Sequence, residues 1–154
     1  MSIEKAKKHL EIYKLSDRMQ ILEESSATVG LAAQALGVTP DEIAKSLSFD
    51  QKGETVIVLL AGERRIDNKK YKGLFNCKAK MLSIDEIEER TGHEVGGVCP
   101  FGVNDDVKVY LDESLKDYQY VYPACGGYNT AIKLSIEELE EASNCLGWID
   151  ISSK

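Results

Sequence analysis

The sequence predicts an α+β domain with a mixed, largely antiparallel β-sheet flanked by helices. Strand-like and helix-like segments follow one another without the strict β-α-β alternation that an all-parallel sheet requires. Capping signals mark several helix starts, and short alternating or apolar runs mark the strands. The chain has 154 residues, 43% of them hydrophobic and 29% charged, as is typical of a globular protein with a sizeable core. We therefore expect a single domain over residues 1–154.

Helix signals dominate the N-terminal third of the chain. Thr28 is a suitable N-cap, and Gly37 is suited to end the same helix in a left-handed conformation. Thr39, Pro40 and Glu42 form a second helix start, with a cap, a proline in the first turn and an acid at the third position. The expected elements are a helix at 3–14, a strand at 17–22, a helix at 28–36, a short helix from 39 and a strand at 45–49.

Capping boxes and a buried apolar run organise the rest of the chain. Residues 56–61 are all apolar and indicate a buried strand. Ser83 with Glu86, and Ser135 with Glu138, are capping boxes. The expected elements are a hairpin turn at 51–54, a strand at 55–61, a helix capped by Asp67 and ending near Gly73, a strand at 77–81, a helix from 83 to 90 stopped by Gly92, strands at 107–111, 119–122 and 130–134, a helix at 135–144, and a strand or tail at 147–151.

Two glycine-rich turns are the most distinctive local feature. Five of the twelve glycines lie in the segments 96–102 and 126–127. Glycine accepts positive φ and lets bare backbone approach a ligand closely. Neither segment matches the dinucleotide-binding or P-loop pattern, so we expect no nucleotide cofactor. Both segments are equally consistent with tight hairpin turns.

The composition predicts a cytoplasmic protein without a membrane partner. The longest apolar run, 56–61, is far too short to cross a bilayer, and the N-terminus is charged rather than signal-like. The four cysteines, Cys77, Cys99, Cys125 and Cys145, form no CxxC pair. We therefore expect free thiols and no metal site.

Charge is distributed unevenly along the chain. The net charge is −7, yet seven basic residues and one acid lie between Arg64 and Lys80. A local basic patch can bind phosphates even on an acidic protein. The candidate residues for binding RNA phosphates are Arg64, Arg65, Lys69, Lys70 and Lys72. The alternatives are a solvated basic helix and, for Arg64 or Arg65, an ion pair with Asp67 or a helix glutamate.

An ordered set of motifs spans most of the chain. Lys45 begins a strand, residues 62–67 read GERRID, residues 96–102 read GGVCPFG, and a last glycine-rich turn leads into an apolar strand. In this order, from about Leu10 to Leu139, the chain resembles the YbaK/ProX family, the prolyl-tRNA synthetase-associated editing domains. The resemblance implies an α+β fold and deacylation of mischarged tRNA in trans, with Cys-tRNA(Pro) or Ala-tRNA(Pro) as substrate. It also implies cooperation with prolyl-tRNA synthetase, while the oligomeric state is left open.

The resemblance assigns roles to individual residues. Lys45 matches the functional lysine of the family, and the glycine turns match its substrate loops. The expected catalytic residues are Lys45, Gly97 and Val98, the two loop residues acting through backbone N–H groups that stabilise the developing oxyanion. The expected substrate-binding residues are Gly96, Pro100, Phe101, Gly102, Gly126, Gly127 and Asn129. The last loop reads GGYNT where related Cys-tRNA(Pro) deacylases carry a basic loop, which leaves the accepted amino acid open.

Two alternatives to this mechanism remain at the level of sequence. Cys99 lies six residues after His93, so a cysteine-dependent hydrolase is one of them. Such an enzyme needs a lowered thiol pKa and a nearby base. The other is a binding module for tRNA ends or for a synthetase, without catalysis.

Overall fold

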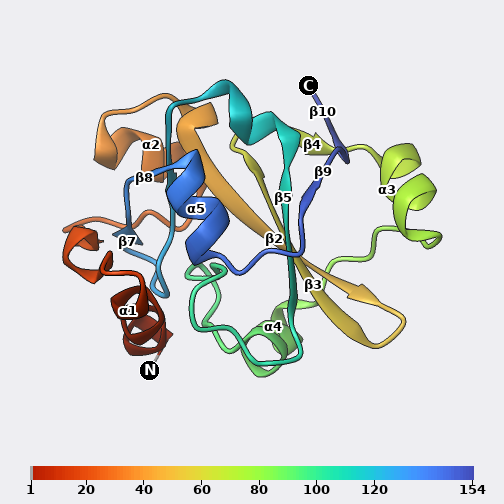
Figure 1. Ribbon diagram of the computed structural model, residues 1–154, viewed down its shortest axis with the longest axis horizontal. Coiled ribbons are helices and arrows are strands. Elements are labelled where there is room, and N and C mark those ends of the chain that lie inside the picture. Colours follow the sequence, from red (N-terminus) through yellow and green to blue (C-terminus); the bar gives the residue numbers. More distant parts are fainter. Residues whose placement is uncertain (1) are drawn as a thin grey trace.

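A six-stranded mixed sheet forms the centre of the molecule. The computed structural model describes residues 2–154, and its main sheet has the strand order β8-β6-β2-β3-β5-β9 (Figure 1). β2 and β3 form a long antiparallel hairpin, β6 and β8 are antiparallel, and the pairings β2–β6, β3–β5 and β5–β9 are parallel. The strands are β2 (Ile43–Gln51), β3 (Glu54–Ala61), β5 (Lys108–Asp112), β6 (Tyr120–Pro123), β8 (Leu134–Ser135) and β9 (Trp148–Ile149).

Short antiparallel pairs tie peripheral segments together. β1 pairs with β7, and the C-terminal β10 pairs with β4, which lies within the GERRID segment. Their bounds are β1 (Gln20–Ile21), β4 (Arg65–Ile66), β7 (Thr130–Ala131) and β10 (Ser152–Ser153). Buried Asp112 fixes the tail, since its carboxylate accepts hydrogen bonds from Ile151 N–H and the Ser152 hydroxyl.

The helices begin where capping chemistry predicts. Thr28 caps α2 and Asp67 caps α3 through their side chains, while capping boxes open α4 and α5. Gly37 and Gly92 end α2 and α4 in the left-handed conformation. The bounds are α1 (Ser2–Ile12), α2 (Val29–Leu36), α3 (Asn68–Phe75), α4 (Ile84–Thr91) and α5 (Ile136–Ala142), with 3₁₀ turns at Ser16–Arg18, Pro40–Glu42 and Glu113–Asp117.

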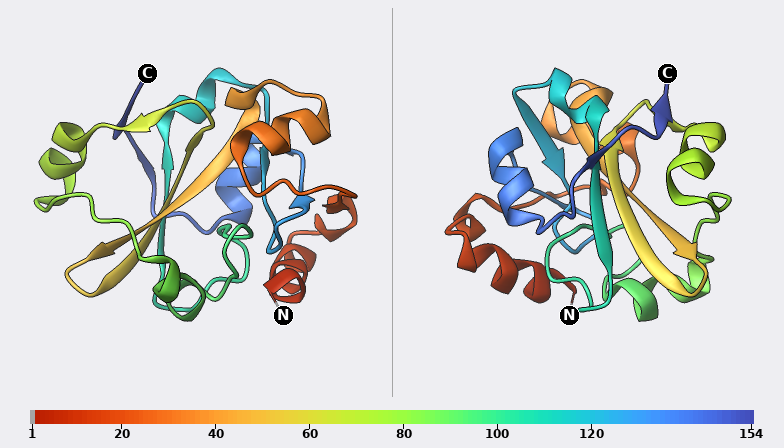
Figure 2. Two further views of the ribbon diagram at one scale, coloured as in Figure 1. Left: turned by 180° about the vertical axis from the view of Figure 1, so that it is seen from behind. Right: turned by 45° about the vertical axis from the view of Figure 1, so that its right-hand side comes forward.

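Helices cover both faces of the sheet. Figure 2 shows α1 and α5 on one side of the strands and α3 on the other. Alternate residues of β3 serve the two sides: Ile57 and Leu59 pack in the core with α1 and α5, and Val56 and Val58 pack with Tyr71 of α3. This alternation explains why residues 56–61 are all apolar, because both faces of the strand are buried there.

The mixed α+β class is confirmed, and several expected boundaries are corrected. Residues 17–22 contain a 3₁₀ turn and a two-residue strand. Residues 77–81 form no strand beyond one bridge between Phe49 and Met81. The expected strand at 130–134 is divided into β7 and the start of β8, which pair with different partners. α3 ends at Phe75 rather than near Gly73, because Asn76 follows as the C-cap and asparagine also accepts the left-handed conformation.

Candidate active site

A cavity opens where two neighbouring strands of the main sheet diverge. β2 pairs with β6 only at Ile43 and Ala44. Further along β2, the same strand edge is covered by an irregular segment, since Leu82 N–H donates to Ser48 C=O and Asp50 N–H to Lys80 C=O. Between these contacts lies a cavity of about 290 Å³. This volume is close to the lower limit for small-molecule sites.

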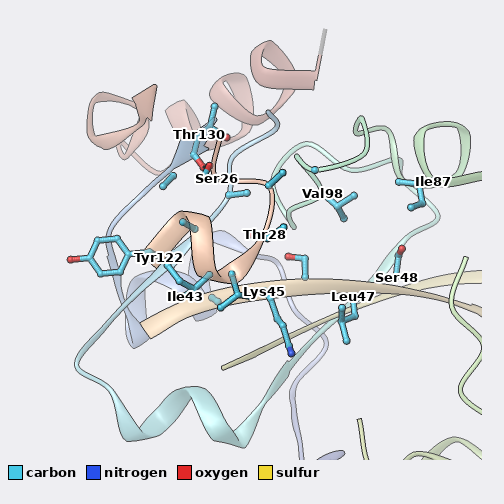
Figure 3. A pocket seen from close by; sticks show the side chains of 18 of the residues that line it. Ser26, Thr28, Ile43, Lys45, Leu47, Ser48, Ile87, Val98, Tyr122 and Thr130 are labelled. Carbon is cyan, nitrogen blue, oxygen red and sulfur yellow. The ribbon is translucent and has the colours of Figure 1, made fainter. Parts of the chain in front are cut away.

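Five segments that are distant in sequence line this cavity. The lining comes from the start of α2, the first half of β2, the region around α4, the first glycine loop and the β6–β7 connection (Figure 3). The lining residues are Ser26, Ala27, Thr28, Val29, Ala32, residues 43–48, Met81, Ile87, Gly96, Val98, Tyr122, Ala124, Thr130 and Ala131. None of these residues is Asp, Glu, His or Cys.

Lys45 forms part of the wall, but its ammonium points away from the cavity. Lys45 and Leu47 extend to one side of β2, whereas Ser48 extends to the side that carries Val98 (Figure 3). The Lys45 Nζ donates to Arg64 C=O at 2.5 Å. Burial lowers the pKa of Lys45, the carboxylate of Asp41 opposes that shift, and the charge of Arg65 adds to it. The ammonium is thus part of a half-buried cluster behind the strand.

The two glycine loops contact each other, as their proposed common site requires. Gly126 N–H donates to Gly97 C=O at 3.1 Å. A Cβ built on Gly97 would lie 2.5 Å from Gly126 C and Gly127 N. Gly97 N–H donates to Glu94 C=O, so its amide is engaged inside the loop in this structure, and its role as an oxyanion donor stays a prediction. Val98 N–H has no acceptor among residues 2–154.

Most other residues of the glycine loops support the fold rather than line the cavity. Pro100 and Phe101 are buried, and the Phe101 ring packs edge-on against the His9 ring. Gly102 and Gly126 have positive φ and lie against the backbone of α1, where a Cβ would be 2.4 Å from Lys5 O and Ser2 O respectively. Only Gly96 of the predicted substrate-binding residues lines the cavity.

The second glycine loop is fixed by its own hydrogen bonds. Thr130 Oγ1 accepts from Gly127 N–H at 3.1 Å and donates to Gly127 C=O at 2.8 Å. Asn129 holds the segment before α2, since its side chain donates to Leu22 C=O and its backbone C=O accepts from Leu22 N–H. In the free protein Gly127 and Asn129 thus stabilise the loop and the segment before α2, and direct contacts of Gly126, Gly127 and Asn129 with substrate stay a prediction.

Cys99 and His93 meet inside the core, not at the cavity. Their Sγ and Nε2 atoms are 3.5 Å apart, and both side chains are fully buried. Burial raises the pKa of the Cys99 thiol and lowers that of His93 to about 4. His93 is held structurally, with Nε2 donating to Phe101 C=O and Nδ1 accepting from the Ser2 hydroxyl. A buried neutral thiol is a poor nucleophile, so the Cys99-dependent mechanism is not supported.

The basic segment divides into structural and free cations. Arg64 donates to the Ser152 hydroxyl and carbonyl, and Lys70 bonds Asp150 and Ser152 C=O. The expected partners of Arg64, Asp67 or a helix glutamate, are thus replaced by the C-terminal strand. Arg65, Lys69 and Lys72 are exposed and make no ion pair within residues 2–154.

Sequence reasoning missed the segment before α2 and the serines of β2. Ser26 and Ala27 carry no motif, and the motif of Thr28 indicates a helix cap rather than a cavity wall. Backbone hydrogen bonds to Tyr128 and Asn129 hold this segment beside the cavity. Ser46 and Ser48 did carry a signal. They alternate with Leu47 and Phe49, which pack on the opposite side of β2, and a polar side chain needs a hydrogen-bond partner where it is buried.

Comparisons with known proteins agree with this architecture. Residues 23–142 match the model of the aminoacyl-tRNA editing domain, a range that contains every residue lining the cavity. The chain therefore belongs to the aminoacyl-tRNA editing domain family.

Individual relatives include stand-alone proteins and parts of synthetases. The chain is 49% identical to the uncharacterized protein YwhH of Bacillus subtilis, over 98% of this chain and 97% of that one. It is 29% identical to EbsC of Enterococcus faecalis, a protein named as a candidate Cys-tRNA(Pro)/Cys-tRNA(Cys) deacylase, over 73% and 70% of the two chains. A solved structure described as a candidate trans-editing enzyme for prolyl-tRNA synthetase superimposes with a TM-score of 0.88 at 28% identity, covering 99% of this chain and 98% of that one. The proline–tRNA ligase of Kosmotoga olearia is 34% identical over 58% of this chain, which corresponds to only 16% of that ligase.

No helix within residues 2–154 has the length and apolar content needed to cross a membrane.

Proposed function

We propose that this protein acts in trans on mischarged tRNA and hydrolyses the ester between the amino acid and the terminal ribose, with Cys-tRNA(Pro) and Ala-tRNA(Pro) as the first candidate substrates. As a member of the editing-domain family, the chain is a hydrolase of aminoacyl esters. The observation that carries the proposal is the cavity between β2 and β6, which lies wholly inside the matched region. We place the protein in the cytoplasm, where charged tRNA is found.

The chemistry needs orientation more than a protein nucleophile. An aminoacyl ester is already activated, so holding it beside water and stabilising the carbonyl oxyanion supplies much of the catalysis. The free N–H of Val98, at the cavity wall, is our candidate oxyanion donor. No carboxylate or imidazole of residues 2–154 lines the cavity. Attack by water, or by the thiol of a cysteinyl substrate, therefore draws its base from the substrate or from solvent.

Lys45 and the free cations of the basic segment are our candidates for binding the tRNA end. Lys45 stands at the cavity wall, and its ammonium lies close enough to Arg65 for the two charges to interact. Arg65, Lys69 and Lys72 continue this positive surface on β4 and α3. Phosphates of the acceptor end would contact these side chains and position the ester without reading sequence.

The test is deacylation of a panel of mischarged tRNAs at catalytic protein concentration. We expect turnover of at least one tRNA(Pro) ester. A Lys45→Ala variant should lower it about tenfold or more, the range for one charged hydrogen bond. Lys8→Ala removes an exposed lysine of α1 and serves as the control. If every tRNA stays charged while binding is retained and salt-sensitive, the protein is a binding module and the proposal is wrong.

A further inference from the structure

The gap between β2 and β6 exposes the backbone of one residue in particular. N–H and C=O groups of successive strand residues point to opposite edges. Ser48 and Asp50 bond the segment at 80–82, so Ser46, two residues earlier, presents its N–H and C=O to the same edge. β6 has already left this edge beyond Ala44. The main-chain groups of Ser46 therefore face the cavity without a strand partner.

The side chain of Ser46 is uncommitted as well. Its hydroxyl oxygen is buried and has no hydrogen-bond partner within residues 2–154. Ser46 pairs across the hairpin with Leu59, as Ser48 does with Ile57, and cross-strand neighbours share a face of the sheet. Figure 3 shows Ser48 on the side of β2 that carries Val98 and Ile87. The Ser46 hydroxyl belongs to that side, which is the floor of the cavity.

Three other hydroxyls of the cavity are already engaged, and those of Ser48 and Tyr122, which have no hydrogen bond within residues 2–154, remain accessible to solvent, unlike that of Ser46. Thr28 Oγ1 accepts from Leu31 N–H as the cap of α2. The Ser26 hydroxyl contacts the carbonyls of Tyr128 and Thr130, and Thr130 Oγ1 bonds both ends of its own loop. The remaining walls are largely apolar. A buried polar group without a partner is costly, and at this position a ligand can supply that partner.

We infer that Ser46 is a specificity-determining residue, whose hydroxyl hydrogen-bonds a β-hydroxyl group of the amino acid and, more weakly, a β-thiol. The inference rests on the proposed function and sharpens its substrate class. The cavity is much larger than a methyl group, so its size alone does not select alanine. Instead, an alanyl group would leave the Ser46 hydroxyl desolvated and unpaired. A site built to hydrogen-bond its substrate rejects the analogue that lacks the bonding group. The expected order of esters is seryl, then cysteinyl, then alanyl, because sulfur is the weaker hydrogen-bonding atom.

The experiment compares tRNA(Pro) charged with serine, cysteine or alanine by an aminoacylating ribozyme, with each rate corrected for hydrolysis without protein. We expect the native protein to prefer the seryl over the alanyl ester about tenfold, the value of one hydrogen bond. Ser46→Ala should bring this ratio close to one, mainly by slowing the seryl ester. Ser46→Thr keeps a hydroxyl and a side chain suited to a strand, and should retain the preference. Ser26→Ala, an equal deletion at the same cavity, should leave the ratio unchanged.

Each outcome has a distinct meaning. If no ester is hydrolysed, the proposed function fails. If esters are hydrolysed but the native protein does not distinguish serine from alanine, or Ser46→Ala keeps the native ratio, the inference about Ser46 is wrong. Melting temperatures separate a structural role from a binding role. A hydroxyl that lacks a partner in the free protein contributes nothing to the fold, so Ser46→Ala should melt at or above the native temperature, and a clear decrease would contradict the assignment.

Discussion

Replacing Gly97 with alanine tests whether the two glycine loops meet as described. Gly97 is buried, and its φ does not demand glycine, so any effect must come from space. A Cβ at this position would lie 2.5 Å from Gly126 C, 2.5 Å from Gly127 N and 2.6 Å from Gly126 O. All three atoms are backbone, which cannot rotate away as a flexible side chain can. One loop must therefore move.

The expected loss of stability follows from that displacement. Inserting a single carbon into a packed interior costs about 1–3 kcal/mol. The hydrogen bond from Gly126 N–H to Gly97 C=O joins the same two loops, and weakening it adds about 0.5–1.5 kcal/mol. We expect Gly97→Ala to lower the free energy of unfolding by about 2–4 kcal/mol. Because Val98 follows directly and lines the cavity, deacylation should fall as well.

Urea denaturation provides the measurement, and Gly73 provides the matched control. Gly73 lies within α3, where an added Cβ would meet no atom within 4 Å and φ is not positive. Gly73→Ala should raise the free energy of unfolding by about 0.5–1 kcal/mol, because alanine is the better helix former. The two identical substitutions thus have opposite expected signs. A Gly97→Ala protein as stable as the native one would refute the close contact between the loops.

Three further predictions concern thiols, pH and tRNA binding. In the native protein Cys77 and Cys145 should react with a thiol reagent and buried Cys99 should not, and iodoacetamide should leave deacylation intact; inactivation that tracks labelling of Cys99 would restore the cysteine mechanism. Burial lowers the pKa of His93 to about 4, whereas the same imidazole in the unfolded chain has a pKa of about 6.5. The free energy of unfolding should therefore decrease as the pH falls from about 6.5 to 4, by at most about 1.4 kcal/mol per pH unit. His93→Gln, measured by denaturation at pH 5 and 7, should show a smaller decline, and an equal decline would assign the effect to other groups. Lys72→Ala should weaken tRNA binding and flatten its salt dependence without changing substrate order, as titrations at several salt concentrations would show; an unchanged slope would remove α3 from the interface.

Local rules were enough to predict much of the fold. Caps at Thr28, Asp67 and Ser135 act within one helical turn, so the printed sequence contains both partners of each interaction. The strand β3 could also be predicted from a short stretch of sequence. Its seven consecutive buried residues show that both faces of the strand are covered. The errors occurred where the partner is distant. Residues 77–81 have strand-like composition, yet they pair with β2 through a single bridge, between Met81 and Phe49.

The site shows the same division. The family resemblance assigned both glycine turns to substrate loops, but glycine alone does not distinguish a loop that binds substrate from a loop that packs on α1. Gly102 and Gly126 turned out to be the second kind. The orientation of Lys45 depends on the phase of β2 relative to β3, and a one-residue shift would reverse it. This register is determined by how the two strands pair, and it cannot be read from a single sequence.

The early departure of β6 from β2 has a consequence for how such a protein diversifies. The space for substrate exists because two main chains separate, and not because small side chains leave a hole in the core. The separation of these strands therefore sets the width of the cavity. Residues 46, 48 and 98 line it, and the backbone of residues 46 and 48 is held by pairing with β3. Substituting these side chains changes which substrate group the cavity binds, and it leaves the strand pairing intact. A scaffold of this kind can serve as a free-standing protein or as an inserted module, and can change its chemical preference one side chain at a time.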